Sequence, residues 1–178
     1  VVFILPLQDR KTVPVQNPYT YGNAWFVNSV KFVDNANQEL DALGQLDLRH
    51  EAVADVKFRE VLKPVAEAEN DSASLVTLTK YEPNQLTYDV KSAKGGVVVF
   101  SEVFYPGWTA TVDGEPVEVG RVNYVLRAIT VQPGQHQVEL LFFPKTIDVT
   151  ETVAYVSLGF LLLLIIVAVF LTYRRSRP

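Results

Sequence analysis

An uninterrupted apolar run from Val153 to Tyr173, without a single charged residue, constrains this chain more than any other feature. As a helix rising about 1.5 Å per residue, the run extends over roughly 31 Å, which matches the hydrocarbon core of a bilayer. A buried core helix of a soluble protein would show amphipathic periodicity, and this run shows none. The sequence therefore predicts one C-terminal transmembrane helix, within a segment covering residues 151–178.

Three arginines, Arg174, Arg175 and Arg177, directly follow the apolar run. Basic residues next to a span are retained on the cytoplasmic side, so we expect a cytoplasmic C-terminus and an extracytoplasmic body over residues 1–152. The chain carries 16 basic and 20 acidic residues, and without these arginines the balance is 13 against 20. Such an acidic body is poorly suited to a phosphate backbone, which argues against nucleic-acid binding.

Composition removes several kinds of chemistry. The chain has no cysteine, which excludes disulfides, cysteine-ligated zinc and thiol catalysis. His50 and His136, both expected to be exposed, leave little for a histidine metal site or triad. No phosphate-binding loop, nucleophile elbow or zinc-protease motif occurs. We predict no catalytic residue, no metal and no cofactor. Methionine is absent, also at position 1, so we expect a piece of a longer polypeptide.

The N-terminal third of the chain is organised around a connector, a strand and a helix. Residues 1–23, rich in Pro, Asn and Gly after a strand-like apolar opening, are typical of a connector from a missing upstream domain. The folded domain is expected over 24–150, beginning with a strand over Ala24–Val33. A helix follows, which Asp34 and Asn35 can cap, with Gln38 in capping-box position after Asn35 and a left-handed Gly44 at its end. Its expected inner stripe is Ala36, Leu40 and Leu43.

The middle and C-terminal thirds of the body are expected to be mostly strands. A helical turn near Phe58–Leu62 and a solvated loop over 66–74, which includes a glycosylation sequon at Asn70, precede them. Leu86, Tyr88 and Val90 alternate with polar residues, as in a half-buried strand. Turn signals recur at Asp113-Gly114, a type I′ hairpin, and at Pro133-Gly134, the centre of a type II turn. The pattern predicts an antiparallel β-sandwich, jelly-roll or immunoglobulin-like, with one or two short helices.

The Asp113-Gly114 hairpin fixes a register that can be read from the sequence. Its two-residue loop sets Val112 opposite Glu115, Ala110 opposite Val117 and Trp108 opposite Val119. Trp108 then lies on the apolar face, so we favour a packing role over a sugar-stacking platform. Tyr105, at the preceding Tyr-Pro-Gly corner, either faces a ligand or makes a structural hydrogen bond.

Two polar features stand out in this half of the chain. Glu102 falls on the buried parity of its strand, so either a bulge turns it out, which we favour, or it pairs with Arg121 or Arg127. Arg121, Asn123, Tyr124 and Arg127 form a cluster suited to phosphate head groups, a lipid-linked phosphate or a neighbouring domain. The alternative is a strand with a solvated face. With Tyr105 and Trp108, these four are our candidate binding residues.

The order of these motifs is also familiar. GNAWFV at Gly22–Val27 is followed by DNANQELDAL, LTYDVKS and then the series YPGW, DG, NYVLRA, PG and H. This order resembles the C-terminal part of the YfhO family of bacterial multi-pass membrane proteins. The likeness extends over nearly the whole chain and is most specific over residues 97–144.

The resemblance implies a function as well as a family. Members look like GT-C-type glycosyltransferases that move a sugar from a polyprenyl-phosphate donor onto a polymer or glycolipid of the bacterial cell envelope. The catalytic acidic residues of such enzymes lie in early extracytoplasmic loops, so this chain is expected to be the accessory, non-catalytic C-terminal region, anchored in the cytoplasmic membrane. Its expected partners are the lipid bilayer, the missing transmembrane domain and a polyprenyl-phosphate sugar or envelope glycan. The alternative is a membrane-anchored, extracytoplasmic glycan- or protein-binding module without enzymatic activity.

Overall fold

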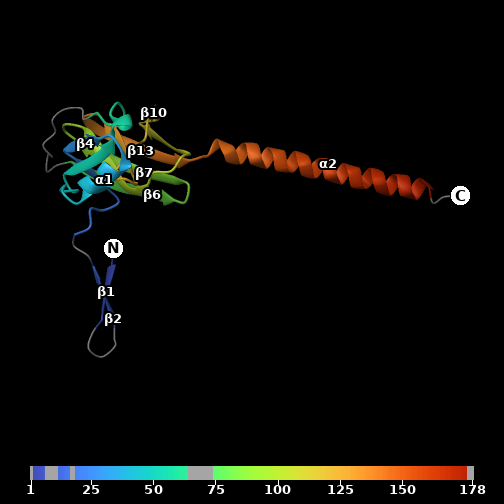
Figure 1. Cartoon of the computed structure of the whole chain (residues 1–178), viewed down its shortest axis with the longest axis horizontal. Helices are drawn as coiled ribbons and strands as arrows, with labels where there is room; N and C mark the ends of the chain where they lie inside the picture. Colours follow the sequence, from blue (N-terminus) through green and yellow to red (C-terminus); the bar gives the residue numbers. More distant parts are fainter. Residues whose placement is uncertain (1, 7–11, 17–18, 64–73, 176–178) are drawn as a thin grey trace. The chain divides into compact units, whose positions relative to one another are not determined.

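The computed structural model describes residues 2–6, 12–16, 19–63 and 74–175. The chain divides into two compact units, Val1–Leu141 and Phe142–Pro178 (Figure 1). The first unit holds the strands and one short α-helix, and the second holds the long C-terminal helix α2. This composition confirms the prediction of a mainly β protein with a C-terminal apolar helix.

The elements of the first unit follow one another along the chain as short strands broken by two helical segments. In order they are β1 (Val2–Pro6), β2 (Thr12–Gln16), β3 (Ala24–Val27), β4 (Ser29–Val33), α1 (Ala36–Leu43), β5 (Glu51–Asp55), the 3-10 turn η1 (Val56–Phe58), β6 (Leu75–Glu82), β7 (Gln85–Ser92), β8 (Gly96–Val103), β9 (Trp108–Val112), β10 (Glu115–Val117), β11 (Gly120–Val122), β12 (Leu126–Val131) and β13 (Gly134–Phe142).

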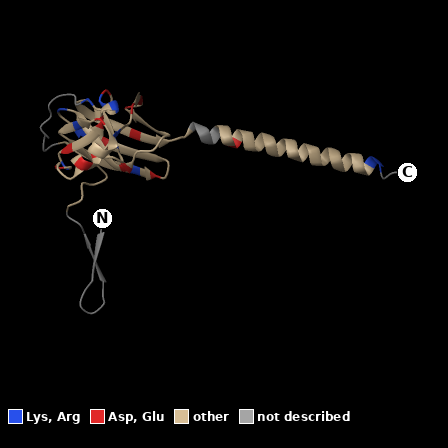
Figure 2. Ribbon diagram, in the orientation of Figure 1, with Lys and Arg blue, Asp and Glu red and all other residues tan. Residues whose placement is uncertain are grey.

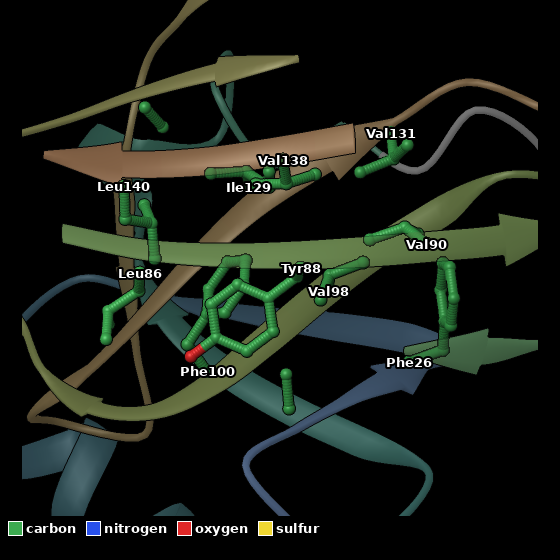
Figure 3. Packing of buried hydrophobic residues seen from close by; sticks show 12 residues of the cluster. Phe26, Leu86, Tyr88, Val90, Val98, Phe100, Ile129, Val131, Val138 and Leu140 are labelled. Carbon is green, nitrogen blue, oxygen red and sulfur yellow. The ribbon is translucent and has the colours of Figure 1, made fainter. Parts of the chain in front are cut away.

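Two antiparallel sheets form the main body. One has the strand order β10-β9-β13-β7-β6 and the other β11-β12-β8-β3. Both sheets contribute to one buried apolar cluster, so they pack face to face as in a sandwich (Figure 3). The predicted alternation in β7 is confirmed for the buried Leu86, Tyr88 and Val90 and for the exposed Asp89 and Lys91, but Thr87, expected to face outward, is buried as well. The Tyr88 and Phe100 rings, one from each sheet, lie 4.9 Å apart between their centroids.

A third layer covers the other face of the four-stranded sheet, which the sequence did not predict. Strands β4 and β5 pair in parallel, and α1 connects them. A parallel pair needs a crossover, and a helix is the usual one. Ala52 and Ala54 of β5, together with Leu62, form a second buried cluster with residues of that sheet.

The predicted strand over 24–33 is wrong in one respect, since it is two strands. β3 ends at Val27 and pairs with β8, whereas β4 begins at Ser29 and pairs with β5. Between them the Asn28 N–H donates a hydrogen bond to the His50 carbonyl at 2.7 Å. At Asn28 the chain thus passes from the four-stranded sheet to the third layer. Because both halves of 24–33 have high β propensity, the sequence does not show that the two strands pair with different partners.

Helix α1 begins as predicted, but its buried face is rotated. Asn35 caps it, since its Oδ1 accepts a hydrogen bond from the Gln38 N–H at 3.0 Å, and Gln38 in turn accepts from the Asp34 N–H. The inner stripe is wrong, because Leu40 is 47 % exposed while Glu39 and Ala42 are buried. The expected left-handed end is wrong as well: Gly44 has φ −75° and continues the right-handed turn.

The turn signals gave mixed results. Asp113 and Gly114 have φ of 53° and 86°, and the pairs Val112–Glu115 and Ala110–Val117 confirm the hairpin register. Pairing stops there, yet Trp108 and Val119 still pack against the core between the sheets. The type II turn at Pro133-Gly134 is wrong, because Gly134 has φ 138° and is already the first residue of β13.

Further predictions concern the segments outside the sheets. The helical turn is confirmed by η1 and by the hydrogen bond from the Leu62 N–H to the Phe58 carbonyl at 2.9 Å. The apolar opening forms β1, as its strand-like composition indicated, but it pairs with a second strand, β2, inside the expected connector. The loop over 66–73 and the sequon at Asn70 lie outside the described residues.

Helix α2 spans Lys145–Arg175, and its part from Val149 to Arg175 is long and apolar enough to cross a membrane. Figure 2 shows this helix without charged residues between an acidic position near its start and the arginines at its end. Its apolar side chains are exposed along the described length. The predicted transmembrane helix is therefore present and begins before the charge-free run.

The turn between β7 and β8 provides a test of backbone conformation. Gly95 has φ 71°, and a Cβ atom there would lie 2.5 Å from the Val131 carbonyl oxygen. We expect Gly95→Ala to lower the free energy of unfolding by about 2 kcal/mol or more, because left-handed strain and a backbone clash combine. Urea unfolding of the full chain in detergent micelles measures this change.

Gly44→Ala is the matched control for this substitution. Gly44 has right-handed φ, and a methyl group added to its Cα would meet no atom within 4 Å, so alanine there should change stability by less than about 0.5 kcal/mol. Equal effects of the two substitutions would contradict the described turn.

The hairpin tip also carries a pH-dependent pair. Asp113 Oδ2 lies 2.6 Å from His136 Nδ1, and Asp113 Oδ1 accepts from the Gln137 N–H at 2.8 Å. The expectation of an exposed His136 is wrong, since its side chain is only 17 % exposed. The hydrogen bond to Asp113 raises the pKa of His136 above 6.5, and the same contact lowers the pKa of Asp113 below 3.8.

These shifts predict how stability depends on pH. A raised pKa means that the folded state holds the proton more tightly, so the contribution of His136 is complete below about pH 6.5 and is lost as pH rises through the raised pKa. The contribution of Asp113 is lost only as pH falls through its lowered pKa. We expect Asp113→Asn to lower the titration midpoint of His136, measured by NMR of the imidazole in micelles. Glu115→Gln should leave that midpoint unchanged.

Candidate functional site

The six candidate residues do not form one site. The structure separates them into two groups, which we name by their central residues. The Glu39 clamp consists of Glu39, Arg121, Asn123 and Tyr124, and the Trp108 cluster consists of Glu102, Tyr105, Trp108 and Arg127. The polar cluster that the sequence suggested between Arg121 and Arg127 is thus divided.

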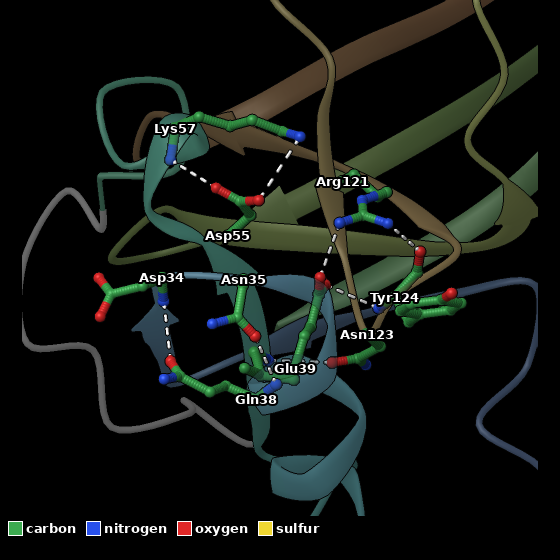
Figure 4. Close-up of polar contacts among 10 residues, drawn as sticks. Asp34, Asn35, Gln38, Glu39, Asp55, Lys57, Arg121, Asn123 and Tyr124 are labelled. Atoms are coloured by element: carbon green, nitrogen blue, oxygen red, sulfur yellow. Dashed lines mark hydrogen bonds and ion pairs between the residues drawn. The ribbon is translucent and has the colours of Figure 1, made fainter.

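The Glu39 clamp joins α1 to the loop between β11 and β12 (Figure 4). Glu39 is 0 % exposed, and one carboxylate oxygen lies 2.7 Å from Arg121 Nη2 while the other accepts the Tyr124 N–H at 2.8 Å. Arg121 Nη1 also donates to the Tyr124 carbonyl at 2.6 Å. Because every contact of this carboxylate is charge-assisted or comes from the backbone, its burial is compensated.

The loop held by the clamp has an unusual backbone. Asn123 and Tyr124 have φ of 50° and 70°, a region that residues other than glycine seldom adopt. The Asn123 N–H donates to the Val53 carbonyl at 2.7 Å, and its Oδ1 accepts the Val53 N–H at 3.0 Å. Asn123 therefore pairs with β5 much as a strand residue would, and this pairing joins the third layer to the β11–β12 hairpin.

Glu39, the residue that organises this group, was not predicted as a site residue from the sequence. Glu39 was not part of the expected stripe of α1, and its partners lie more than eighty positions along the chain. The available signal was its position in the first helical turn, where an acidic side chain is favoured by the helix dipole. That signal does not indicate a tertiary partner.

Replacing Glu39 tests the clamp. Glu39→Gln keeps the shape but sets an amide against Arg121, so we expect the free energy of unfolding to fall by about 2–3 kcal/mol, somewhat below a fully buried pair since Arg121 keeps 18 % exposure. Urea unfolding of the full chain in micelles reports the change, with the exposed Glu115→Gln as control. A loss within about 0.5 kcal/mol would show that the clamp does not stabilise the fold.

The Trp108 cluster lies where β8 passes into β9. The Arg127 guanidinium stacks on the Trp108 ring, with 4.0 Å between Cζ and the ring centroid, and Arg127 Nη2 lies 3.3 Å from Glu102 Oε2. Arg127 is 1 % exposed, whereas the Glu102 side chain is 33 % exposed. Trp108 packs on the core between the sheets, which confirms that its face of the hairpin is the buried one.

Both explanations offered for Glu102 hold together. Arg127 pairs with Phe100 and its neighbour Leu126 pairs with Val103, so β8 has two extra residues across one step of β12. Glu102 lies in this bulge, and from it the carboxylate meets Arg127 rather than Arg121. The bulge lets the carboxylate keep water on one side while it neutralises a buried cation.

Burial dominates the electrostatics of this cluster. It lowers the pKa of the Arg127 guanidinium, which Glu102 opposes, and it raises the pKa of Tyr88 to about 12, which Glu102 reinforces. The Tyr88 hydroxyl therefore stays neutral at physiological pH. Nε and Nη1 of Arg127 are buried and have no hydrogen-bond partner in the described part of the chain. Burying these two donors without a partner costs free energy, and stacking of the guanidinium on Trp108 offsets part of that cost.

An apolar groove of about 530 Å³ adjoins the cluster. It is bordered by Tyr105 and Trp108, with further lining from Phe58, Val61, Phe104, Pro106, Ala110, Pro116, Val117 and Val119. Two charged residues, Lys57 and Glu118, also line it. Such a groove suits an apolar ligand and holds no arrangement of nucleophile and base.

A second groove, of about 610 Å³, was not predicted from the sequence. Its lining includes Tyr21, Trp25, Arg49 and His50 together with the first residues of β6. The Arg49 guanidinium lies 4.9 Å from the Tyr21 ring centroid, and Trp25 Nε1 donates to the Leu48 carbonyl at 3.1 Å. The aromatic rings are therefore partly occupied by the protein's own groups.

Neither groove has the donor set of a metal centre. In the part of the chain that the structure describes, no three His, Cys, Asp or Glu side chains come close enough to hold a metal ion. The carboxylates near the candidate residues, Glu39 and Glu102, are each committed to an arginine.

Comparison with known proteins gives two matches. A family model described as bacterial membrane protein YfhO matches residues 15–154. An uncharacterized protein YfhO of Bacillus subtilis (strain 168) is 22 % identical over 135 residues, which cover 76 % of this chain and 14 % of that protein. The chain thus spans a small part of the length of this relative. No solved structure matches it.

Proposed function

The chain belongs to the YfhO family of bacterial membrane proteins, and we propose that it is the accessory, non-catalytic extracytoplasmic region and final span of a glycosyltransferase of the cytoplasmic membrane. The whole protein would transfer a sugar from a polyprenyl-phosphate donor to a cell-envelope acceptor. This proposal rests on the family resemblance of the motifs, since the names of the matching family and relative state no activity.

One observation supports the accessory role: the side chains of Arg121, Asn123 and Arg127 are held by contacts within the fold. Glu39 holds Arg121 and the Tyr124 N–H, and Asn123 is paired with Val53. Arg127 is buried against Trp108 and Glu102. Side chains committed in this way position a surface, and they do not leave an acid, base or nucleophile free for glycosyl transfer.

The proposed sidedness rests on charge. The arginines that end α2 favour a cytoplasmic C-terminus, which would put the sandwich on the extracytoplasmic face. Protease added to sealed cells should then cleave the sandwich, and a reporter that fluoresces only in the cytoplasm should be active after Pro178. Protection of the sandwich together with a silent reporter would reverse the proposed orientation.

The second groove favours one alternative, a membrane-anchored module that binds glycan or protein without catalysis. Tyr21, Trp25 and Arg49 supply the aromatic and cationic surface that such ligands use. An upstream gene segment that encodes only a signal peptide would favour this alternative, whereas a series of hydrophobic spans would favour the glycosyltransferase.

The accessory role is tested in the intact polypeptide, reconstituted in vesicles with a polyprenyl-phosphate-linked sugar. We expect Glu102→Gln to leave kcat within about twofold of the unmodified protein, because this carboxylate serves Arg127 and not the reaction. Glu115→Gln, at an exposed position of the hairpin, is the matched control, because it makes the same chemical change at a residue without a role in the cluster. A loss of kcat of about a thousandfold in a folded Glu102 variant would make this region catalytic. If the unmodified protein transfers no sugar in this assay, the proposed glycosyltransferase activity is overturned.

A further inference from the structure

One end of the sandwich gathers exposed apolar residues. Thr109 Oγ1 donates to the Leu141 carbonyl at 3.3 Å, so the start of β9 lies beside the end of β13. The Phe104 N–H donates to the Val125 carbonyl at 2.6 Å, so the β11–β12 loop lies beside the chain that leads from β8 to β9. We call this end of the first unit the β13 end, and its exposed apolar residues include Val103, Tyr105, Val125 and Leu141.

These side chains are unusually accessible for their type. Val103 and Tyr105 are each 60 % exposed, and Val125 and Leu141 are 42 % and 41 % exposed. The loop from Val103 to Gly107 contains no charged residue, and Tyr105 also lines the groove beside Trp108. Exposed apolar residues that gather at one end of a domain indicate a binding face.

The chain itself fixes what lies near this face. Four residue steps separate Leu141 from Lys145, the first residue of α2, which bounds the gap at roughly 14 Å. From Lys145 to the start of the charge-free run at Val153 the helix rises about 12 Å. Whatever angle α2 adopts, Leu141 therefore lies within roughly 26 Å of Val153, where the charge-free run begins.

We propose that the β13 end contacts the lipid head-group region of the bilayer that α2 spans. Tyr105 is suited to this position, because a tyrosine combines an apolar ring with a polar hydroxyl and is enriched at membrane interfaces. Val103 and Val125 would add apolar contact at the level of the head groups. The inference goes beyond the proposed function and does not depend on glycosyl transfer.

The opposite end of the sandwich supplies the comparison. Leu75 begins β6 and pairs with Lys91, whereas the other end of that strand pairs at Gln85. Strand β6 ends at Glu82, which belongs to the β13 end because Gln85, its partner, also pairs with Leu141. Along a strand of this length Leu75 lies about 23 Å from Glu82. Leu75 is 60 % exposed, as Tyr105 is, so the two positions match in accessibility and differ in location.

The test uses the absence of cysteine from the chain. Tyr105→Cys and Leu75→Cys each introduce the single thiol to which a fluorophore is attached, and the full chain is reconstituted in phosphatidylcholine vesicles. Nitroxide-labelled lipids then quench any fluorophore at the bilayer surface. We expect the label at 105 to lose most of its fluorescence and the label at 75 to lose little. Equal quenching at both positions, or none at 105, overturns the proposal.

A second pair of variants separates specific contact from mere proximity. The label is moved to Val125→Cys and read with Tyr105 intact, with Tyr105→Asp, or with Leu40→Asp on the exposed face of α1. We expect Tyr105→Asp to relieve the quenching, because it replaces the apolar ring that favours the interface with a hydrated carboxylate, and Leu40→Asp to leave it unchanged. Quenching that persists with Tyr105→Asp overturns the proposed contact. Neither result bears on sugar transfer, which is measured separately.

Discussion

A buried carboxylate, Glu39, connects the parts of this structure that the two sheets alone would leave separate. It comes from the crossover helix of the third layer, and it binds Arg121 and the backbone of the β11–β12 loop. Two residues of that loop have left-handed backbones, which only an over-determined surrounding sustains. The contacts of Asn123 with Val53 then extend the same connection into β5.

The Trp108 cluster follows a related principle at the neighbouring edge of the core. A bulge in β8 brings Glu102 to the buried Arg127, and the Trp108 ring covers the guanidinium. The same bulge and corner lead the chain into the exposed loop over 103–107. The ion pair of Glu102 and Arg127 thus lies directly beside the apolar loop over 103–107.

Much of the fold followed from local sequence. The alternation in β7, the Asp113-Gly114 hairpin and the apolar run of α2 each contain their own structural signal, because strand pleat, turn geometry and helix length are local properties. The buried face of α1, the parallel pairing of β4 with β5 and the corner at Gly134 were predicted wrongly. Each depends on a neighbour remote in sequence, and propensity carries no information about it.

The sequence by itself determined that this chain is β-rich, ends in a helix long enough to span a bilayer and belongs with the YfhO membrane proteins. Tertiary structure alone decided what the polar residues do. Arg121 and Arg127 are similar in sequence context, yet one clamps a helix and the other lies buried beneath an indole ring. The reason is physical: an arginine's role depends on which carboxylate folding brings within hydrogen-bond distance, and each partner here lies twenty or more residues away.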